Sequence, residues 1–421
     1  MQVLSSSLDG RIRTNGLKLN MNRIEVKDTY KIFGHKPLKQ AYPLIEKGES
    51  KSEIFRKTGC TVAVNNASFE VGQNEIFVVM GLSGSGKSTL LRLINRLIDP
   101  TSGEILIDGE DVCRFSKERL RDLRRGKMSM VFQHFGLLPH RTVLENVGFG
   151  MEIQKTPEEE RIRKSKEAIE LVGLEQNMDS MIAELSGGMQ QRVGLARGLA
   201  TDPEIMLMDE AFSALDPLIR TQMQDELLQI QAKMHKSILF ITHDLDEALK
   251  LGDRVAIMKD GFIDQIGTPE QILTNPATEY VQAFVENVDR SKVITAGTAM
   301  HKTSALVEHT VGPHLCARRM HQLDWSVLLV VDDDRNFLGY VTIDDVLALA
   351  ERTPEEEDQQ ITRNIESVIR KDMPTTGEET PVIDLLSESA EKDLPIAVLE
   401  EDGIFKGVIT RPALLAAISG D

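Results

Sequence analysis

Short apolar runs recur between residues 62 and 289 and alternate with stretches of helical periodicity. The runs at residues 75–80, 128–132, 204–208 and 237–241 are rich in Val, Ile, Leu, Met and Phe. Short runs of this composition are typical of β-strands. Their alternation with helices predicts an α/β domain built around a largely parallel sheet.

Residues 34–61 differ from this pattern and read as amphipathic helix. Ser52 is predicted to cap the second of two short helices. The apolar positions that indicate the helical face are Ala41, Leu44, Ile45, Ile54 and Phe55. The segment therefore reads as a helical insert that precedes the main strands of the domain.

The last 130 or so residues contain an internal repeat. Residues 327–342 and 396–410 both read strand, turn, strand, and their first strands begin 69 residues apart. Each copy then runs into a short apolar helix, at residues 346–349 and 414–417. We predict two packed βαββα units at residues 294–352 and 366–421, separated by an acidic linker. Residues 1–21 are polar and are predicted to be a disordered lead, with Met21 as an alternative start.

Charge and composition narrow the choice of partners. The net charge is −17, and residues 294–421 carry 24 acidic against 11 basic side chains, which argues against nucleic acid as their partner. The basic run at residues 117–127 is interleaved with Glu118 and Asp122 and is predicted to be a solvated surface helix. The three cysteines form no CxxC pair, so reduced thiols are expected. No stretch is apolar enough to span a bilayer, so a pore would belong to a partner chain.

Residues 81–88 read Gly-Leu-Ser-Gly-Ser-Gly-Lys-Ser and match the phosphate-binding loop G-x-x-x-x-G-K-[ST]. The loop follows an apolar run and precedes a helical one, so its backbone N–H groups and the helix N-terminus can surround phosphate oxygens. Lys87 is expected to reach the β- and γ-phosphates of ATP, and Ser88 to ligate Mg²⁺. The residues predicted to bind ATP here are Gly81, Ser83, Gly84, Ser85, Gly86, Lys87, Ser88 and Thr89.

Two carboxylates end the apolar run at residues 204–208. Asp209 is expected to complete the Mg²⁺ shell. Glu210 points to the other face of the strand end, because side chains alternate along a strand. It is predicted to polarise the attacking water as general base.

A second anion site is indicated at residues 185–192, Leu-Ser-Gly-Gly-Met-Gln-Gln-Arg, which precede a helical run. One nucleotide needs only one phosphate cradle. We therefore expect Ser186, Gly187 and Gly188 to contact ATP that is bound by the other protomer of a homodimer. A helix cap without a ligand is the alternative.

In this order, the phosphate loop, Gln133, residues 185–188, Asp209, Glu210, residues 213–216 and His243 resemble the ATPases of ATP-binding-cassette (ABC) proteins. The resemblance implies a P-loop domain with a mixed sheet and a helical subdomain. It also implies that Gln133 contacts Mg²⁺ and the water, that Asp216 bridges two protomers, and that His243 holds the γ-phosphate. Met189 stands where Gln is commoner.

An adenine-stacking aromatic usually precedes the phosphate loop in this family. Here its usual distance from the loop falls within the helical insert. Phe33 resembles it, displaced by the insert, and Phe55 is the competitor.

Nearly the whole chain, from about residue 22, resembles more closely the ATPase subunits of glycine betaine/proline betaine uptake systems, with the nucleotide-binding domain at residues 22–289 and the repeat as a pair of CBS modules. That resemblance implies a substrate-binding protein and an integral-membrane permease as partners, and a location at the cytoplasmic face of the plasma membrane. The alternatives are an importer for choline, carnitine or proline, or a non-transport ABC protein.

Two features bear on partners and regulation. The apolar loop at residues 135–143 either packs on its own helical subdomain or forms part of a groove for a permease helix.

In CBS pairs, a Thr and an Asp three residues later contact an adenosine nucleotide. Thr342 and Asp345 fit this pattern, whereas the second copy has Thr410 and Ala413. A cyclic dinucleotide, ionic strength acting on the acidic modules, and dimerisation without sensing stay open.

Overall fold

A computed structural model describes residues 22–132, 136–213, 215–286, 288, 290–351, 364–391 and 394–419. These residues form two compact units, which divide between Thr268 and Pro269. In the part of the chain that is described, no helix has both the length and the apolar character to cross a membrane. The predicted lead at residues 1–21 lies outside the described residues.

A six-stranded sheet in the order β10-β9-β3-β8-β7-β6 forms the centre of the first unit. Strands β9, β3, β8, β7 and β6 run parallel to their neighbours, and β10 pairs antiparallel with β9. The bounds are β3 (Ile76–Met80), β6 (Met128–Val131), β7 (Ile205–Asp209), β8 (Ser237–Thr242), β9 (Arg254–Lys259) and β10 (Phe262–Gly267). The four apolar runs are therefore adjacent strands of a largely parallel sheet, as expected. Strands β3, β7 and β8 are buried along their length, β6 is half buried, and the antiparallel β10 makes the sheet mixed.

A second, antiparallel sheet has the order β2-β1-β4-β5. Its strands are β1 (Ile24–Phe33), β2 (Thr61–Val71), β4 (Ser102–Ile107) and β5 (Glu110–Asp111). Phe33 pairs with Thr61, so residues 34–60 leave the sheet and return at the same point. This helical insert comprises α1 (Pro37–Gln40), α2 (Tyr42–Glu46) and α3 (Lys51–Thr58). The predicted cap Ser52 is wrong, because Ser50 caps α3 in a capping box with Glu53.

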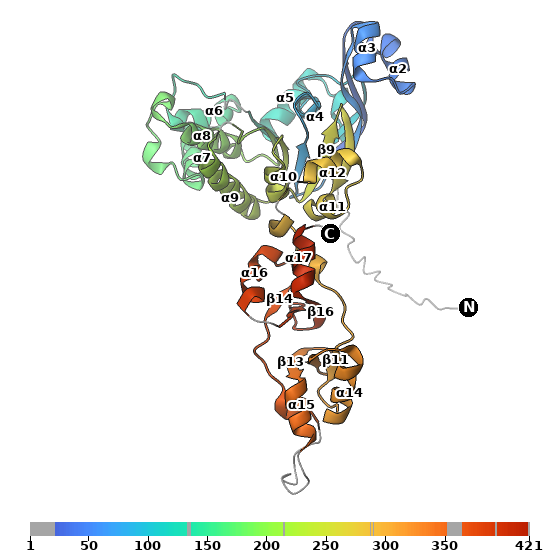
Figure 1. Cartoon of the computed structure of the whole chain (residues 1–421). Helices are drawn as coiled ribbons and strands as arrows, with labels where there is room; N and C mark the ends of the chain where they lie inside the picture. The colour runs from blue at the N-terminus through green and yellow to red at the C-terminus, as the bar shows by residue number, and fades with distance from the viewer. Residues whose placement is uncertain are drawn as a thin grey trace, which may run out of the picture. The chain divides into compact units, whose positions relative to one another are not determined.

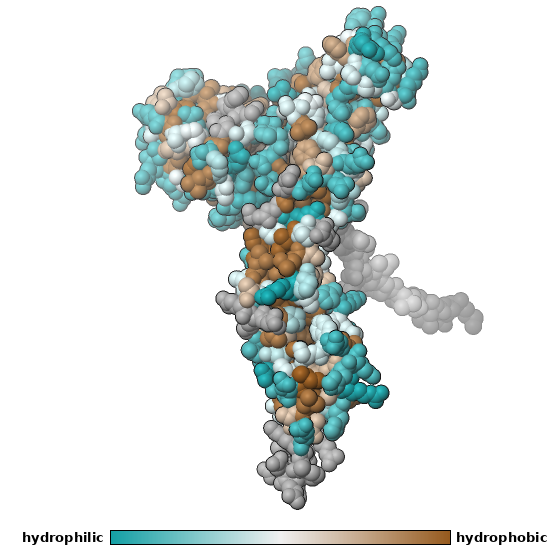
Figure 2. Space-filling view, in the orientation of Figure 1, coloured by the Kyte–Doolittle hydropathy of each residue, from teal (hydrophilic) through white to brown (hydrophobic). Residues whose placement is uncertain are grey.

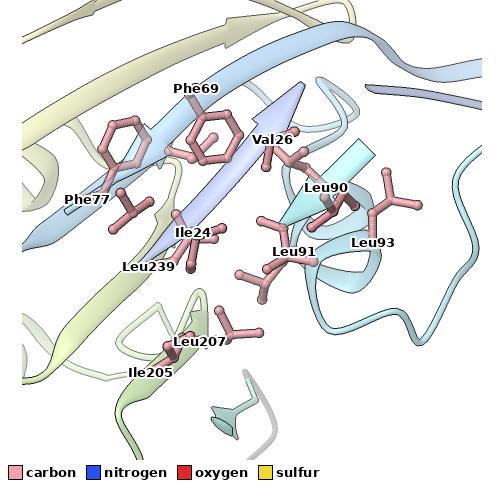
Figure 3. Packing of buried hydrophobic residues seen from close by; sticks show 14 of the residues in the cluster. Ile24, Val26, Phe69, Phe77, Leu90, Leu91, Leu93, Ile205, Leu207 and Leu239 are labelled. Carbon is pink, nitrogen blue, oxygen red and sulfur yellow. The ribbon is translucent and has the colours of Figure 1, made fainter. Parts of the chain in front are cut away.

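The main core of the first unit lies between the two sheets and helix α4 (Lys87–Ile94). Figure 3 shows Ile24 and Val26 of β1 on the side of α4 that carries Leu90 and Leu91, and Leu93 farther from the strand in the same buried cluster. The rings of Phe69 and Phe77 join β2 to β3, with their centroids 5.1 Å apart. Burial on this scale holds the phosphate loop, which connects β3 to α4, between two fixed elements.

The remaining helices of the first unit include a helical lobe of α6, α7 and α8 (Figure 1), which pack against one another. The bounds are α5 (Lys117–Gly126), α6 (Val143–Ile153), α7 (Glu158–Leu171), α8 (Gly187–Ala200), α9 (Pro217–Met234) and α10 (Leu245–Leu251). Helix α5 buries only Leu120 and Leu123, so its basic residues form a solvated surface helix, as expected.

The second unit begins with α11 (Pro269–Thr274) and α12 (Glu279–Val285) and contains two three-stranded sheets. The first module comprises β11 (Leu306–Glu308), α14 (Pro313–Leu323), β12 (Val327–Val331), β13 (Phe337–Thr342) and α15 (Ile343–Ala350). The second comprises β14 (Thr375–Gly377), α16 (Val382–Glu391), β15 (Ile396–Leu399), β16 (Phe405–Ile409) and α17 (Arg411–Ser419). Each matches the expected strand, helix, strand, strand, helix order.

The two modules exchange their leading segments. The segment with Ile294 and α13 (Ala296–Ala299), which precedes the first module, packs in the core of the second, and His301 pairs with Val408 of β16. Conversely, Ile365 packs in the core of the first module, and Arg370 pairs with Tyr340 of β13. The predicted domain boundaries stay a prediction, because each leading segment precedes one module in the sequence and packs in the core of the other.

Apolar side chains also reach the surface of the second unit. Figure 2 shows them gathered over α16 and α17. Leu386 and Leu415 are 37% and 58% exposed. Exposed apolar groups clustered on one face are typical of surfaces that contact another molecule.

Candidate active site

The loop between β3 and α4 is shaped by glycines at positions where a side chain would not fit. Gly81 and Gly86 have φ angles of +153° and +110°, and a Cβ atom at either would lie 2.1 Å from a backbone oxygen, of Met258 and Ala63 respectively. The carbonyl of Ser85 accepts a hydrogen bond from the Gly261 N–H at 2.9 Å. These contacts hold the loop against β2 and the turn between β9 and β10, with its backbone curved for phosphate.

Lys87 is the cation of this loop, and it is 5% exposed. Its Nζ donates to the carbonyl oxygens of Gly81 at 2.8 Å and Leu82 at 3.1 Å. Burial lowers the pKa of Lys87, and Glu210 and Asp209 act in the opposite direction. A buried ammonium whose hydrogen bonds go to neutral carbonyl oxygens favours the arrival of an anion such as a phosphate.

Ser85 adds an unpaired polar atom beside that cation. Its Oγ is buried and has no hydrogen-bond partner among the described residues. Because buried hydroxyls are usually paired, this atom fits a loop that binds a polar ligand. Ser83, Gly84 and Thr89 lie in the same loop and the first turn of α4, where the sequence predicted them.

Ser88 and Asp209 meet at the start of α4 and the end of β7. The Ser88 hydroxyl donates to Asp209 Oδ1 at 2.8 Å, and Asp209 is 6% exposed. A hydroxyl and a carboxylate are hard oxygen donors, so the pair fits Mg²⁺. Within the described ranges no group of three or more His, Cys, Asp or Glu could hold a metal.

Glu210 follows Asp209 with a left-handed backbone, φ +47°. Its N–H donates to the Ile241 carbonyl at 3.0 Å, and its carbonyl accepts from the Ser213 hydroxyl at 2.9 Å. Its carboxylate Oε2 lies 3.3 Å from Nδ1 of His243, at the end of β8. Asp209 and Glu210 thus contact different residues. Since β7 ends at Asp209 and Glu210 is left-handed, the turn after the strand, and not the alternation along it, sets the direction of Glu210.

The residues at 185–188 lie at the N-terminus of α8. The Ser186 hydroxyl accepts from the Met189 N–H at 3.3 Å and so caps the helix. Ser186 and Gly187 are exposed, and a Cβ at Gly187 would meet nothing within 4 Å, whereas one at Gly188 would lie 2.8 Å from Cγ2 of Ile219. Asp216 is also exposed and caps α9 through the Ile219 N–H at 3.1 Å.

Three further predicted residues are Gln133, Phe33 and Phe55. Gln133 lies outside the described residues. Phe33 is 42% exposed at the end of β1 and borders a cavity of about 590 Å³, which also includes Lys31, Lys36 and Thr101. Its strand pairs with β2, whose Ala63 carbonyl abuts Gly86. Phe55 lies on α3 and is 58% exposed.

In the second unit, Thr342 and Asp345 are adjacent, with a hydrogen bond of 2.7 Å. Arg370, which the sequence did not single out, binds both oxygens of Asp345 at 2.7 and 2.8 Å. The hydrogen bonds from Arg370 hold the pKa of Asp345 below its usual value. The carboxylate expected to meet a nucleotide is therefore already paired.

Sequence reasoning also missed two residues that support the site. Gly261 follows Asp260 between two strands, and that Asp-Gly pair was a hairpin signal. Gln191 reaches the carbonyl of Ala211, next to Glu210. In the sequence, Gln191 was recognisable only as a polar residue just before the apolar stretch of α8.

Models of two protein families match the chain. The ABC transporter model matches residues 64–213. The CBS domain model matches residues 315–352 and 365–420.

Three bacterial ATP-binding proteins are similar along nearly their whole length. The glycine betaine/carnitine transport protein of Listeria monocytogenes is 50% identical over 95% of this chain and 98% of its own. The glycine betaine transport protein of Bacillus subtilis is 49% identical over 95% and 93%. The glycine betaine/proline betaine transport protein of Escherichia coli is 45% identical over 94% and 97%.

Among solved structures, CbiO1 of Clostridium perfringens, part of an ABC transporter complex, superposes with a TM-score of 0.51. It is 25% identical over 61% of this chain and 92% of that one.

Proposed function

The chain belongs to the ATP-binding subunits of glycine betaine and proline betaine ABC uptake systems that carry CBS domains, and on that premise we propose that two copies hydrolyse ATP to drive betaine uptake through a membrane permease. One observation carries the substrate class. Identity of 45–50% extends over both the cassette and the repeat of three betaine relatives. A choline transport ATP-binding protein of Bacillus subtilis is 34% identical, as is a glycine betaine/carnitine/choline one, and two trimethylamine N-oxide transport ATP-binding proteins are 54% and 51% identical over 66% and 65% of this chain. The proposed substrate therefore rests on the relatives that match along nearly the whole chain.

Different residues of the first unit bind the phosphates, the metal ion and the adenine of ATP. The loop from Gly81 to Ser88 holds the phosphates, and Lys87 exchanges its carbonyl partners for phosphate oxygens. Ser88 and Asp209 hold Mg²⁺, which neutralises phosphate charge when it is bound with ATP. Gln133 adds a contact to the ion and the water. Phe33, rather than Phe55, stacks on the adenine.

Glu210 orients and polarises the attacking water, and His243 keeps its carboxylate in place and contacts the γ-phosphate. In the homodimer, Ser186, Gly187 and Gly188 of one copy contact the γ-phosphate that the other copy holds. The exposed helix N-terminus and the open space at Gly187 support that role. Asp216 bridges the two copies from its exposed position at the start of α9.

The partners follow from the family. The permease binds near residues 136–142, where His140 is exposed and Leu138 is held to Asn146 of α6. This contact keeps the subunit at the cytoplasmic face of the membrane. The substrate-binding protein delivers the betaine from the other side. The CBS pair regulates the motor, through a nucleotide at Thr342 and Asp345 or through ionic strength.

The test uses the complete transporter in lipid vesicles with internal ATP and labelled glycine betaine. Uptake that requires the binding protein and is lost in Glu210→Gln supports the proposal. Hydrolysis that responds to choline or carnitine but not to glycine betaine would reassign the substrate and leave the ATPase role intact. A matched chain that ends at residue 289 tests regulation, since a regulatory CBS pair predicts that salt activates only the full chain.

A further inference from the structure

Gln191 of α8 is buried beside the catalytic strand end. It is 1% exposed, and its Nε2 donates to the carbonyl of Ala211, the residue after Glu210. Its Oε1 is also buried and has no partner within the described part of the chain. Leu or Met would fill a similar volume without an unpaired acceptor, so packing alone does not account for the amide.

The Ala211 carbonyl belongs to a stretch of backbone that has to be held. Glu210 adopts φ +47°, which is uncommon for a residue with a side chain and persists only where its surroundings fix it. Ile241 binds the Glu210 N–H and Ser213 binds its carbonyl. Gln191 binds the carbonyl of the next residue, Ala211, and thereby holds the Ala211–Phe212 peptide, which directly follows the two peptides that flank Glu210.

The same helix begins at the exposed residues Ser186 and Gly187. Gln191 is three residues beyond Gly188, less than one helical turn. Contacts with α9 fix this end of the helix. Gly188 packs on Ile219, and Arg192 forms an ion pair of 2.6 Å with Glu226. A shift of the α8 N-terminus would therefore displace the Gln191 amide with it.

We propose that Gln191 is a positioning residue that couples the N-terminal end of α8 to Glu210 of the same chain. The inference rests on the proposed function, in which that helix end contacts ATP held by the other copy. Contact with this second ATP fixes the position of the α8 N-terminus. Gln191 then fixes the position of the Ala211 carbonyl, and this keeps the Glu210 carboxylate in its active orientation. Each copy thus senses the partner's nucleotide and adjusts its own general base.

The experiment compares variants of the full chain in the complete transporter by kcat, KM for ATP and thermal unfolding. Gln191→Met keeps the volume and removes the donor. Its matched control is Gln231→Met, because Gln231 is also buried and donates to a backbone carbonyl, of Asn74, at 2.8 Å in α9. We expect Gln191→Met to lower kcat by about tenfold or more with KM within about twofold, and Gln231→Met to change kcat by less than about twofold.

Gln191→Glu supplies a readout that loss of packing would not give. An ionised glutamate cannot donate to the Ala211 carbonyl, whereas a protonated one can. Burial raises the pKa of a carboxyl, so protonation falls within an accessible range. We expect kcat of this variant, relative to wild type, to recover as pH is lowered.

Three outcomes would overturn the inference: wild-type kcat in Gln191→Met, a change confined to KM, or a loss no larger than that of Gln231→Met at equal destabilisation. If Gln191→Met fails to assemble, a Gln191→Glu ratio that does not vary with pH overturns it as well. Glu210→Gln is run in parallel. Full activity of that variant contradicts the proposed function itself, whereas its inactivity beside an unaffected Gln191→Met contradicts only the coupling.

Discussion

Nδ1 of His243 lies 3.3 Å from Oε2 of Glu210, so the ends of two neighbouring strands, β7 and β8, place a base and an imidazole in contact. Glu210→Gln is expected to lower hydrolysis by roughly 10²–10⁴-fold and to retain ATP binding, because it removes only the proton acceptor. His243→Ala should lower kcat less, since the base remains. Steady-state hydrolysis and nucleotide binding by both variants provide the check, and a loss of ATP affinity equal to the loss of rate would contradict these roles.

Lys87→Met should separate binding from folding. The ammonium is buried and donates to two carbonyl oxygens, and the effect of burial outweighs the attraction of Glu210 and Asp209, so its removal should leave the melting temperature of the ATP-free chain unchanged or raised. ATP affinity should fall by about 10–100-fold, the value of a lost charged hydrogen bond. Calorimetric titration and thermal unfolding with and without ATP test both. A lower melting temperature without ATP would mean that Lys87 stabilises the fold.

The glycines of the phosphate loop should differ in what they tolerate. Gly86→Ala places a Cβ 2.1 Å from the Ala63 carbonyl at φ +110° and should destabilise the chain by roughly 2–4 kcal/mol. Gly84→Ala is the control. It has φ +81° but open space, so its cost should be about 1 kcal/mol. Equal unfolding free energies from denaturant titration would contradict the role given to the contact with Ala63.

Gly187 and Gly188 offer a matched pair at the start of α8. Gly187→Ala meets nothing within 4 Å and should preserve stability, yet it should reduce hydrolysis by the homodimer about tenfold or more, because a methyl group stands where the partner's phosphate approaches. Gly188→Ala has to displace Ile219 and should also lower the melting temperature. Normal hydrolysis by Gly187→Ala would argue that the helix end is only capped.

The Arg370–Asp345 ion pair should make the second unit sensitive to acid. The folded pKa of Asp345 is depressed, so its contribution to stability is present above the unfolded pKa of about 3.9 and is lost as pH falls through the folded value. Arg370→Gln should therefore lower the melting temperature at pH 7 by about 2 °C or less, a small effect because Arg370 is half exposed. The difference should shrink as pH falls below the unfolded pKa, and one that stays constant with pH would assign it to packing.

Local patterns were sufficient to predict candidate residues such as Asp209 and Lys87, because these lie at a strand end and at a helix start. Asp209 follows an apolar run, and Lys87 follows glycines before a helix. They were not sufficient for contacts between distant segments. The approach of Ala63 to Gly86, the backbone of Glu210 and the amide of Gln191 depend on how strands are ordered across two sheets, which no short window encodes.

The repeat also combines features that the sequence predicted with contacts that it did not. Its two copies were visible from the 69-residue spacing, and each has the expected element order. The pairing of His301 with Val408 and of Arg370 with Tyr340 was not visible, because both leading segments resemble ordinary linkers. Ser50, and not the predicted Ser52, caps α3, because the helix begins two residues earlier than expected.

That exchange of leading segments limits how the chain can be shortened. If the second module were removed together with its leading segment, Ile294 and Ala296 would lose the core in which they pack. The first module would also lose Ile365 from its own core. Two apolar surfaces would be bared by one cut. Gene rearrangements in this family should therefore gain or lose the pair as a whole, and a chain found with a single copy should carry compensating polar substitutions at the positions of Ile294 and Ala296.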